Sequence, residues 1–152
     1  MQIDILFGTE SGNSEMVAED IASAIAEAGD VTVRDMAGVD PADLVPSTFY
    51  LVVCSTYGDG QLPEGAVPFF RALGQQTPDL SGVRYAMYGL GDSDYVYSYS
   101  EGSEIIDRAL TQRGAERVGE YGRHDAAEEE DPSVLGVAWA QGVLANAQIL
   151  HA

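Results

Sequence analysis

The chain has 152 residues, the size of one folded domain, and we expect residues 1–152 to form a single domain. It contains 25 acidic residues and only seven basic ones, all arginines, and its net charge is −18. Such a surface repels nucleic acid and anionic membranes, which excludes both as partners, and it attracts a basic protein face. Solubility and adaptation to high salt are alternative reasons for the charge.

The cysteine content and the hydropathy of the chain indicate the cellular compartment of the protein. Cys54 is the only cysteine, which excludes an intramolecular disulfide and a cysteine-built metal site and fits a reducing compartment. The N-terminus lacks the basic and apolar segments of a secretory leader. No apolar run reaches the roughly 18–20 residues that a membrane-spanning helix needs. We therefore expect a cytoplasmic protein.

Strand and helix signals alternate along the chain. Strands are predicted at residues 3–7, 31–36, 49–54, 83–88 and 115–121, and the second of them is expected to be more exposed. Helices are predicted at 15–28, about 66–75, around 105–110 and about 133–150. Ser14 is the expected N-cap of the first helix and Gly29 its expected end. The buried face of this helix should carry Val17, Ile21, Ala24, Ile25 and Ala28. The run at 49–54 suits a central parallel strand covered on both faces.

This alternation predicts an α/β fold with three layers, in which a doubly wound, five-stranded parallel sheet lies between helices. In such sheets, ligands bind at the carboxyl ends of the strands, where the strand order switches. The loops after the first, third and fourth strands should therefore converge on one site.

The first of these loops, residues 8–14, consists of small hydrogen-bonding residues between a strand and a helix. Backbone N–H groups, hydroxyls and the positive end of the helix dipole favour a phosphate there. The loop lacks both the Gly-Lys-Ser/Thr ending of nucleotide loops and the Gly-x-Gly-x-x-Gly dinucleotide turn. Because the chain has no lysine, the expected donors are neutral, which suits a monophosphate: Thr9, Ser11, Asn13 and Ser14. The alternative to a phosphate site is a turn whose small polar residues only cap the helix that follows.

Tyrosines stand out in the other two loops. Tyr57 lies at the tip of residues 55–60, between small residues that let a flat ring approach. Tyr95, Tyr97 and Tyr99 lie in residues 89–100, where rings can stack on a flat ligand. Together with the phosphate donors, they predict an aromatic ligand with a phosphate tail. For residues 55–60 the alternative is an ordinary Asp-Gly turn with an exposed tyrosine. For residues 89–100 the alternative is a short strand whose tyrosines lie in the core.

Three motifs resemble those of flavodoxins. Gly-Thr-Glu-Ser-Gly-Asn-Ser-Glu resembles their phosphate loop. Ser-Thr-Tyr-Gly-Asp-Gly and Tyr-Gly-Leu-Gly-Asp-Ser-Asp-Tyr resemble the flavin loops of FMN domains in cytochrome reductase and sulfite reductase flavoproteins. The resemblance covers essentially the whole chain. It implies a flavodoxin-like fold with strand order 2-1-3-4-5 and FMN as the cofactor.

The resemblance also implies which residues bind the cofactor. Those at the phosphate would be Thr9, Glu10, Ser11, Gly12, Asn13 and Ser14. Those on one side of the ring would be Ser55, Thr56, Tyr57, Gly58 and Asp59. Those on the other side would be Leu90, Gly91, Asp92, Tyr95, Tyr97, Ser98 and Tyr99. Asp125 would be an acid near the flavin. Ser98 stands where the family usually has Phe, which leaves the roles of residues 97–99 open.

The remaining conspicuous residues are expected to be structural. Cys54 ends a buried strand, and Trp139 in the last helix is expected to pack rather than contact the flavin. His124 and His151 lack the spacing of metal ligands, so no metal site is expected. The acidic run at residues 128–131 suits a solvated loop, with a docking face as the alternative.

The predicted function is electron transfer rather than enzymatic catalysis. The dinucleotide fingerprint is absent, as is a Ser/His/Asp or Cys/His set, so a bound flavin would supply the chemistry. We expect a one-electron carrier between an NAD(P)H-linked flavin reductase and an acceptor. A bacterial haem monooxygenase, or another basic-faced redox protein, is the expected acceptor. The alternative is an NAD(P)H-dependent quinone or FMN reductase. A phosphate-regulated receiver domain is disfavoured because its acidic pair and lysine are missing.

Overall fold

The computed structural model describes residues 1–10, 12–56, 61–91, 101–125 and 130–151, and the side chains up to residue 146. Its strands are β1 (Gln2–Gly8), β2 (Asp30–Asp35), β3 (Thr48–Ser55), β4 (Arg84–Gly91), β5 (Glu116–Arg117) and β6 (Gly122–Asp125). All the strand pairs are parallel, and the order β2-β1-β3-β4-β5 confirms the predicted 2-1-3-4-5. β6 also pairs with β4, further along the same edge.

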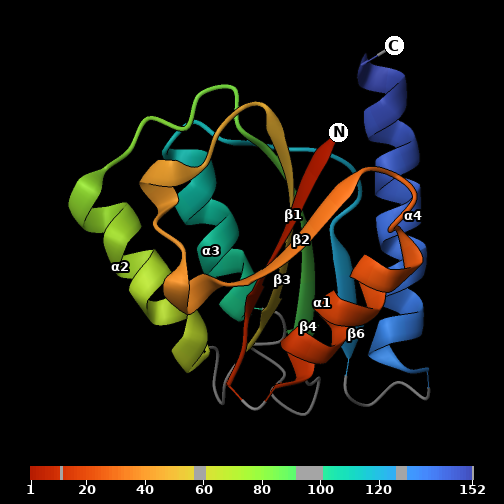
Figure 1. The fold of residues 1–152 in the computed structure, drawn as a ribbon. Coiled ribbons are helices and arrows are strands. Elements are labelled where there is room, and N and C mark those ends of the chain that lie inside the picture. The colour runs from red at the N-terminus through yellow and green to blue at the C-terminus, as the bar shows by residue number, and fades with distance from the viewer. Residues whose placement is uncertain (11, 57–60, 92–100, 126–129, 152) are drawn as a thin grey trace.

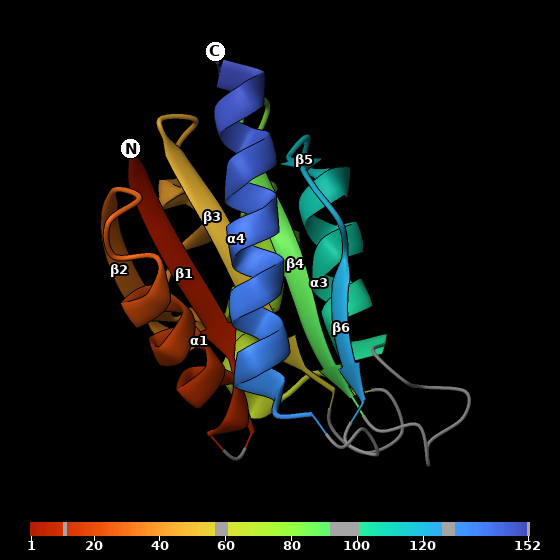
Figure 2. The same cartoon turned by 90° about the vertical axis from the view of Figure 1, so that its right-hand side faces the viewer.

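Helices cover both faces of the sheet, which gives the predicted three layers (Figure 1). The α-helices are α1 (Asn13–Ala24), α2 (Val67–Gln76), α3 (Glu101–Gln112) and α4 (Pro132–His151). Short 3-10 helices are η1 (Met36–Gly38), η2 (Pro41–Asp43) and η3 (Glu64–Ala66). α1 and α4 lie on one face, and α2 and α3 lie on the other (Figure 1). Figure 2 looks onto the face that α1 and α4 cover. No helix in the described part of the chain is long and apolar enough to cross a membrane.

The alternation of side chains along β3 builds two separate cores. Phe49, Leu51 and Val53 belong to the core under α1 and α4. Tyr50, Val52 and Cys54 belong to the core under α2 and α3. Successive residues of a strand face opposite sides, so a strand covered on both faces must be apolar throughout. β3 lies between β1 and β4 in the sheet and is buried along almost its whole length, which confirms the prediction of a central strand.

The predicted fifth strand, residues 115–121, is wrong in its extent. β4 pairs with β5 near its start and with β6 near its end. Residues 118–121, between β5 and β6, are not part of the sheet. Val118 still donates its N–H to the Tyr85 carbonyl at 2.7 Å, but Gly119 then adopts a left-handed φ of 81°. Pairing resumes at Gly122, and Asp125 is the last residue of β6.

The ends of α1 also differ from the prediction. The helix begins at Asn13 and ends at Ala24, so Ser14 lies inside its first turn and is not the N-cap. Gly12 takes the N-cap position, and the helix stops before it reaches Gly29. Of the predicted face, Val17, Ile21 and Ile25 are buried, whereas Ala24 is exposed and Ala18 is buried in its place. The other helix predictions hold to within a few residues at their ends.

Candidate functional site

The strand register brings three predicted loops to one edge of the sheet. Gly8 at the end of β1 is level with Cys54 of β3. Ser55 is level with Leu90 of β4. Gly91 is level with Asp125 of β6. The segments that follow β1, β3, β4 and β6 therefore start side by side at the carboxyl edge, where a parallel sheet binds its ligands.

The loop after β1 is folded by its own hydrogen bonds. The Thr9 hydroxyl accepts the Gly12 N–H at 2.7 Å, which closes a tight turn in front of α1. Gly12 has a left-handed φ of 94°, a conformation that side-chain-bearing residues rarely adopt. Apart from Gly12 itself and its chain neighbours, no described residue has an atom within 4 Å of the position that a Cβ would take on Gly12, so the described residues leave the space beside this turn free. The turn therefore presents its backbone to an open space at the start of a helix.

Ser14 is the most informative residue of this loop. Its side chain is fully buried in the first turn of α1, and its Oγ finds no hydrogen-bond partner among the described residues. Buried hydroxyls almost always have a partner, because leaving one unsatisfied costs about 1–3 kcal/mol. Ser14 lies in the first turn of α1, and backbone N–H groups and the positive end of the helix dipole favour an anion at a helix N-terminus. Its hydroxyl is therefore a candidate donor to an anion at this end of the helix.

Glu10 and Thr9 fix the loop to the segment before α2. The Glu10 carboxylate accepts the Glu64 N–H at 2.5 Å, and the Thr9 carbonyl accepts the Gly65 N–H at 3.0 Å. The Glu10 carboxylate thus binds the N-terminus of η3. Asn13 is exposed at the start of α1.

The loop after β3 is tied to its neighbours on both sides. Ser55 Oγ donates to the Gly8 carbonyl at 3.3 Å, and the Thr56 N–H donates to the Leu90 carbonyl at 2.9 Å. Thr56 Oγ1 accepts the Gly102 N–H at 2.9 Å, from the first turn of α3. Gly102 gave no signal in the sequence, because its role depends on a contact with a residue far away in the chain.

Beside this loop, Leu90 is buried, whereas Gly91 and Asp125 are partly exposed. The neighbouring His124 is buried, and its Nε2 lies 2.9 Å from the Glu130 carbonyl, which links β6 to the segment before α4. Asp125 is therefore positioned at the edge by strand pairing. Several predicted site residues lie outside the described residues: Ser11, Tyr57, Gly58, Asp59, Asp92, Tyr95, Tyr97, Ser98 and Tyr99.

Two residues predicted to be structural are found in packed positions. Cys54 is completely buried, and burial raises the pKa of its thiol to about 12. Trp139 packs against Tyr88 with ring centroids 5.2 Å apart, and its indole N–H donates to the Glu120 carbonyl at 2.8 Å. In the described part of the chain, no group of three or more His, Cys, Asp or Glu residues could hold a metal ion.

Comparisons with known proteins identify the family. The family model described as Flavodoxin matches residues 5–136. Flavodoxin YqcA of Pectobacterium carotovorum is 34% identical over 92% of this chain and 93% of its own length. The sulfite reductase [NADPH] flavoprotein alpha-component of Bacillus subtilis is 31% identical over 94% of this chain. The chain spans only 23% of the length of that subunit, and as little as 7% of another relative.

Solved structures agree with these matches. A cysteine-to-alanine mutant of flavodoxin from Pseudomonas aeruginosa superimposes with a TM-score of 0.86 at 29% identity, over 97% of this chain and 99% of the other. Proteins of this family bind FMN, and the chemistry of the residues at the edge fits that cofactor. The hydroxyl of Ser14 and the open turn at Gly12 offer neutral donors and space for its phosphate. The chain belongs to the flavodoxin family, and its cofactor is FMN.

Proposed function

We propose that this flavodoxin carries single electrons from an NAD(P)H-linked flavin reductase to a haem monooxygenase or another redox protein with a basic face. The observation that carries the site assignment is the buried hydroxyl of Ser14 in the first turn of α1, which has no partner among the described residues. A phosphate there would receive the Ser14 O–H and helix N–H groups, and would relieve the cost of an unsatisfied buried group.

The phosphate end of the proposed site is residues 9–14, and its rigidity supports the assignment. The loop is held within itself by the contact between Thr9 and Gly12, and from outside by the contact between Glu10 and Glu64. Donors that are already held in place cost less to order when the ligand binds. Glu10 would act through this contact, because an ionised carboxylate cannot donate to a phosphate.

The ring end of the proposed site is the group of residues 55–59, 90–99 and 125. Of these, Ser55, Thr56, Leu90 and Gly91 lie on adjacent strand ends that hydrogen bonds link directly. FMN supplies the redox chemistry when it is bound. Asp125, at the end of β6, would place a carboxylate at the same edge. A negative charge near the ring disfavours added negative charge on it and thereby lowers its potential.

The acidic surface supports a basic-faced partner. Exposed acids lie on the segments that border the carboxyl edge: Glu10, Glu15, Glu64, Glu130 and Asp131. Opposite charges on two proteins accelerate their encounter and orient it. A basic face around the electron-accepting group of the partner would therefore bring the two redox centres together. Flavodoxins in general take electrons from a reductase and pass them on, as this proposal requires.

A reduction experiment tests the proposal. FMN-loaded protein is mixed without oxygen with NAD(P)H, first alone and then with a catalytic amount of an NADPH-dependent flavin reductase. We expect the flavin absorbance to bleach only after the reductase is added. A mixture with a ferric bacterial haem monooxygenase should then show transfer of the electrons to haem. Rapid bleaching by NAD(P)H alone would instead identify a quinone or FMN reductase.

A further inference from the structure

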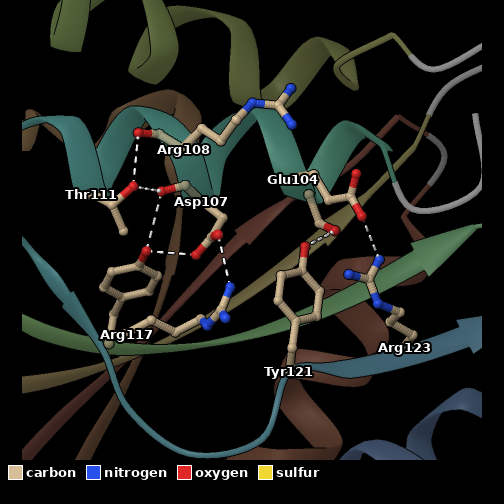
Figure 3. A network of polar contacts seen from close by, with 9 residues as sticks. Glu104, Asp107, Arg108, Thr111, Arg117, Tyr121 and Arg123 are labelled. Carbon is tan, nitrogen blue, oxygen red and sulfur yellow. Dashed lines mark hydrogen bonds and ion pairs between the residues drawn. The ribbon is translucent and has the colours of Figure 1, made fainter.

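A polar network joins α3 to the strands at the edge of the sheet (Figure 3). Its half nearer the carboxyl edge contains Ser103 and Glu104 from the first turn of α3, and Tyr121 and Arg123 from the chain around the start of β6. Its other half joins Tyr85 and Arg117 to Asp107, one turn later in α3. The half nearer the carboxyl edge has a further connection, to the proposed ring site.

Tyr121 is the centre of that half. Its hydroxyl is hydrogen-bonded to the hydroxyl of Ser103, which is fully buried. Its ring is contacted by two guanidinium groups, with the carbon of Arg123 4.0 Å and that of Arg117 5.0 Å from the ring centroid. Arg123 in turn donates to the Glu104 carboxylate at 2.9 Å. These contacts fix the first turn of α3 against the chain that leads to Asp125.

The same turn of α3 is also fixed against the loop after β3. The Gly102 N–H donates to Thr56 Oγ1, and a Cβ on Gly102 would lie 2.5 Å from the Ser55 carbonyl oxygen and 2.8 Å from Thr56 Cα. Only glycine permits an approach this close. Adjacent residues of one turn, Gly102 and Ser103, therefore connect the two sides of the carboxyl edge: Ser55 and Thr56 on one side, and β6 with Asp125 on the other.

Burial raises the pKa of the Tyr121 hydroxyl to about 12, so it stays protonated and available to Ser103 at any physiological pH. The contact is therefore made by two neutral hydroxyl groups at physiological pH, and removing the Tyr121 oxygen tests it.

We propose that Tyr121 is a positioning residue for the flavin ring: through Ser103 it holds the first turn of α3, and this turn sets the position of Ser55 and Thr56 relative to Asp125. This proposal rests on the proposed function in one respect: it takes these segments to line the flavin ring. It predicts that Tyr121 affects binding of the ring and leaves binding of the phosphate unchanged. Its partners Ser103 and Gly102 are expected to act through the same turn.

The test compares Tyr121→Phe with Tyr85→Phe. Both variants keep the ring and lose one hydroxyl that contacts α3, but Tyr85 lies six residues before Gly91 on β4, about 20 Å from the carboxyl edge. Apoprotein of each variant is titrated with FMN and with riboflavin, and the midpoint potential of bound FMN and the unfolding of the apoprotein in urea are measured.

We expect Tyr121→Phe to weaken both FMN and riboflavin by the same factor, at most about fivefold, because one hydrogen bond is the most that the pre-ordering of this turn can contribute to binding. The midpoint potential should shift with it, and Tyr85→Phe should leave affinity and potential at wild-type values. Lower stability of Tyr121→Phe with unchanged affinity and potential would overturn the proposal, as would equal effects of the two variants. Failure of the wild-type protein to bind FMN would instead contradict the proposed function.

Discussion

At the scale of single residues, burial decides what a side chain can do. Ser14 and Cys54 are both completely buried beside the carboxyl edge, yet their positions differ in chemistry. The Ser14 hydroxyl lies at a helix N-terminus with no partner in the described part of the chain, and the Cys54 thiol lies among apolar side chains. The first is suited to bind an anion, and the second is suited to remain a neutral packing group.

The pKa of Cys54 predicts how stability depends on pH. Burial raises it from 9.0 to about 12, so the folded chain retains the thiol proton at pH values where the unfolded chain loses it. The contribution of the neutral thiol is complete below about pH 9 and is lost as the pH rises toward 12, at about 1.4 kcal/mol per pH unit.

Urea unfolding of the wild type and of Cys54→Ala between about pH 8.5 and 10 measures this effect. The tyrosines that begin to titrate in this range are the same in both proteins, so their contribution cancels when the two are compared. The wild type should lose stability with rising pH more steeply than the variant. The slopes are compared rather than the absolute values, because the variant also leaves a cavity. Equal slopes would mean that the thiol ionises normally in the folded chain.

At the scale of elements, the strands that build the core were predictable from local sequence. Apart from Asp4 and Arg84, residues 3–7, 49–54 and 83–88 are apolar or aromatic, because a parallel strand buried on both faces has no side exposed to solvent. The split fifth strand was not predictable, because Tyr121 leaves the ladder for a contact with Ser103 that exists only in the folded chain. The start of α1 was missed for a related reason. Ser14 has the residue type of a cap, but in this fold Gly12 takes the cap position.

The site shows the same division between local and distant information. Thr9, Gly12 and Ser14 could be recognised because they follow one another in the chain and form a local turn. Gly102 could not be recognised, because it matters through its close contact with Ser55 and Thr56, and Thr56 lies 46 residues earlier in the chain. Site residues that are adjacent in the sequence form a recognisable motif. Residues that contribute through contacts with distant parts of the chain do not.

The packing of α4 on β4 leads to a prediction for Trp139. Its ring packs on Tyr88 and its indole N–H donates to the Glu120 carbonyl, and neither of these residues is assigned to FMN. Trp139→Phe keeps an aromatic ring and loses the hydrogen bond, so the free energy of unfolding should fall by about 1 kcal/mol. FMN titration of the same variant should give the wild-type affinity. A weakened affinity would place Trp139 in the flavin site and contradict its packing role.

At the scale of the whole molecule, charge is the dominant property. The chain has only seven arginines, and its net charge is −18. In the described part of the chain, Arg34 is paired with Asp4, Arg117 with Asp107 and Arg123 with Glu104, and such pairs leave the net charge unchanged. The field around the molecule is therefore strongly negative, and it is long-ranged at low salt.

This field predicts the salt dependence of electron transfer. Raising the ionic strength from 0.01 to 1 M shortens the screening length from about 30 Å to about 3 Å. In stopped-flow mixing of the reduced protein with a basic redox partner, the second-order rate should fall steeply over this range. An acidic partner serves as the control and should show the opposite trend. A rate to the basic partner that does not depend on salt would leave solubility or salt adaptation as the reason for the acidity.

The claim on which the account depends is that residues 9–14 hold the phosphate of FMN, with the hydroxyl of Ser14 as a donor. The most direct measurement is a fluorescence titration of wild-type and Ser14→Ala apoprotein with FMN and with riboflavin, which lacks the phosphate. The wild type should bind FMN more tightly than riboflavin. Ser14→Ala should weaken FMN about ten- to hundredfold, the value of a hydrogen bond to a charged group, and leave riboflavin unchanged. Equal affinities of the wild type for the two ligands, or an FMN affinity that Ser14→Ala does not change, would contradict the account.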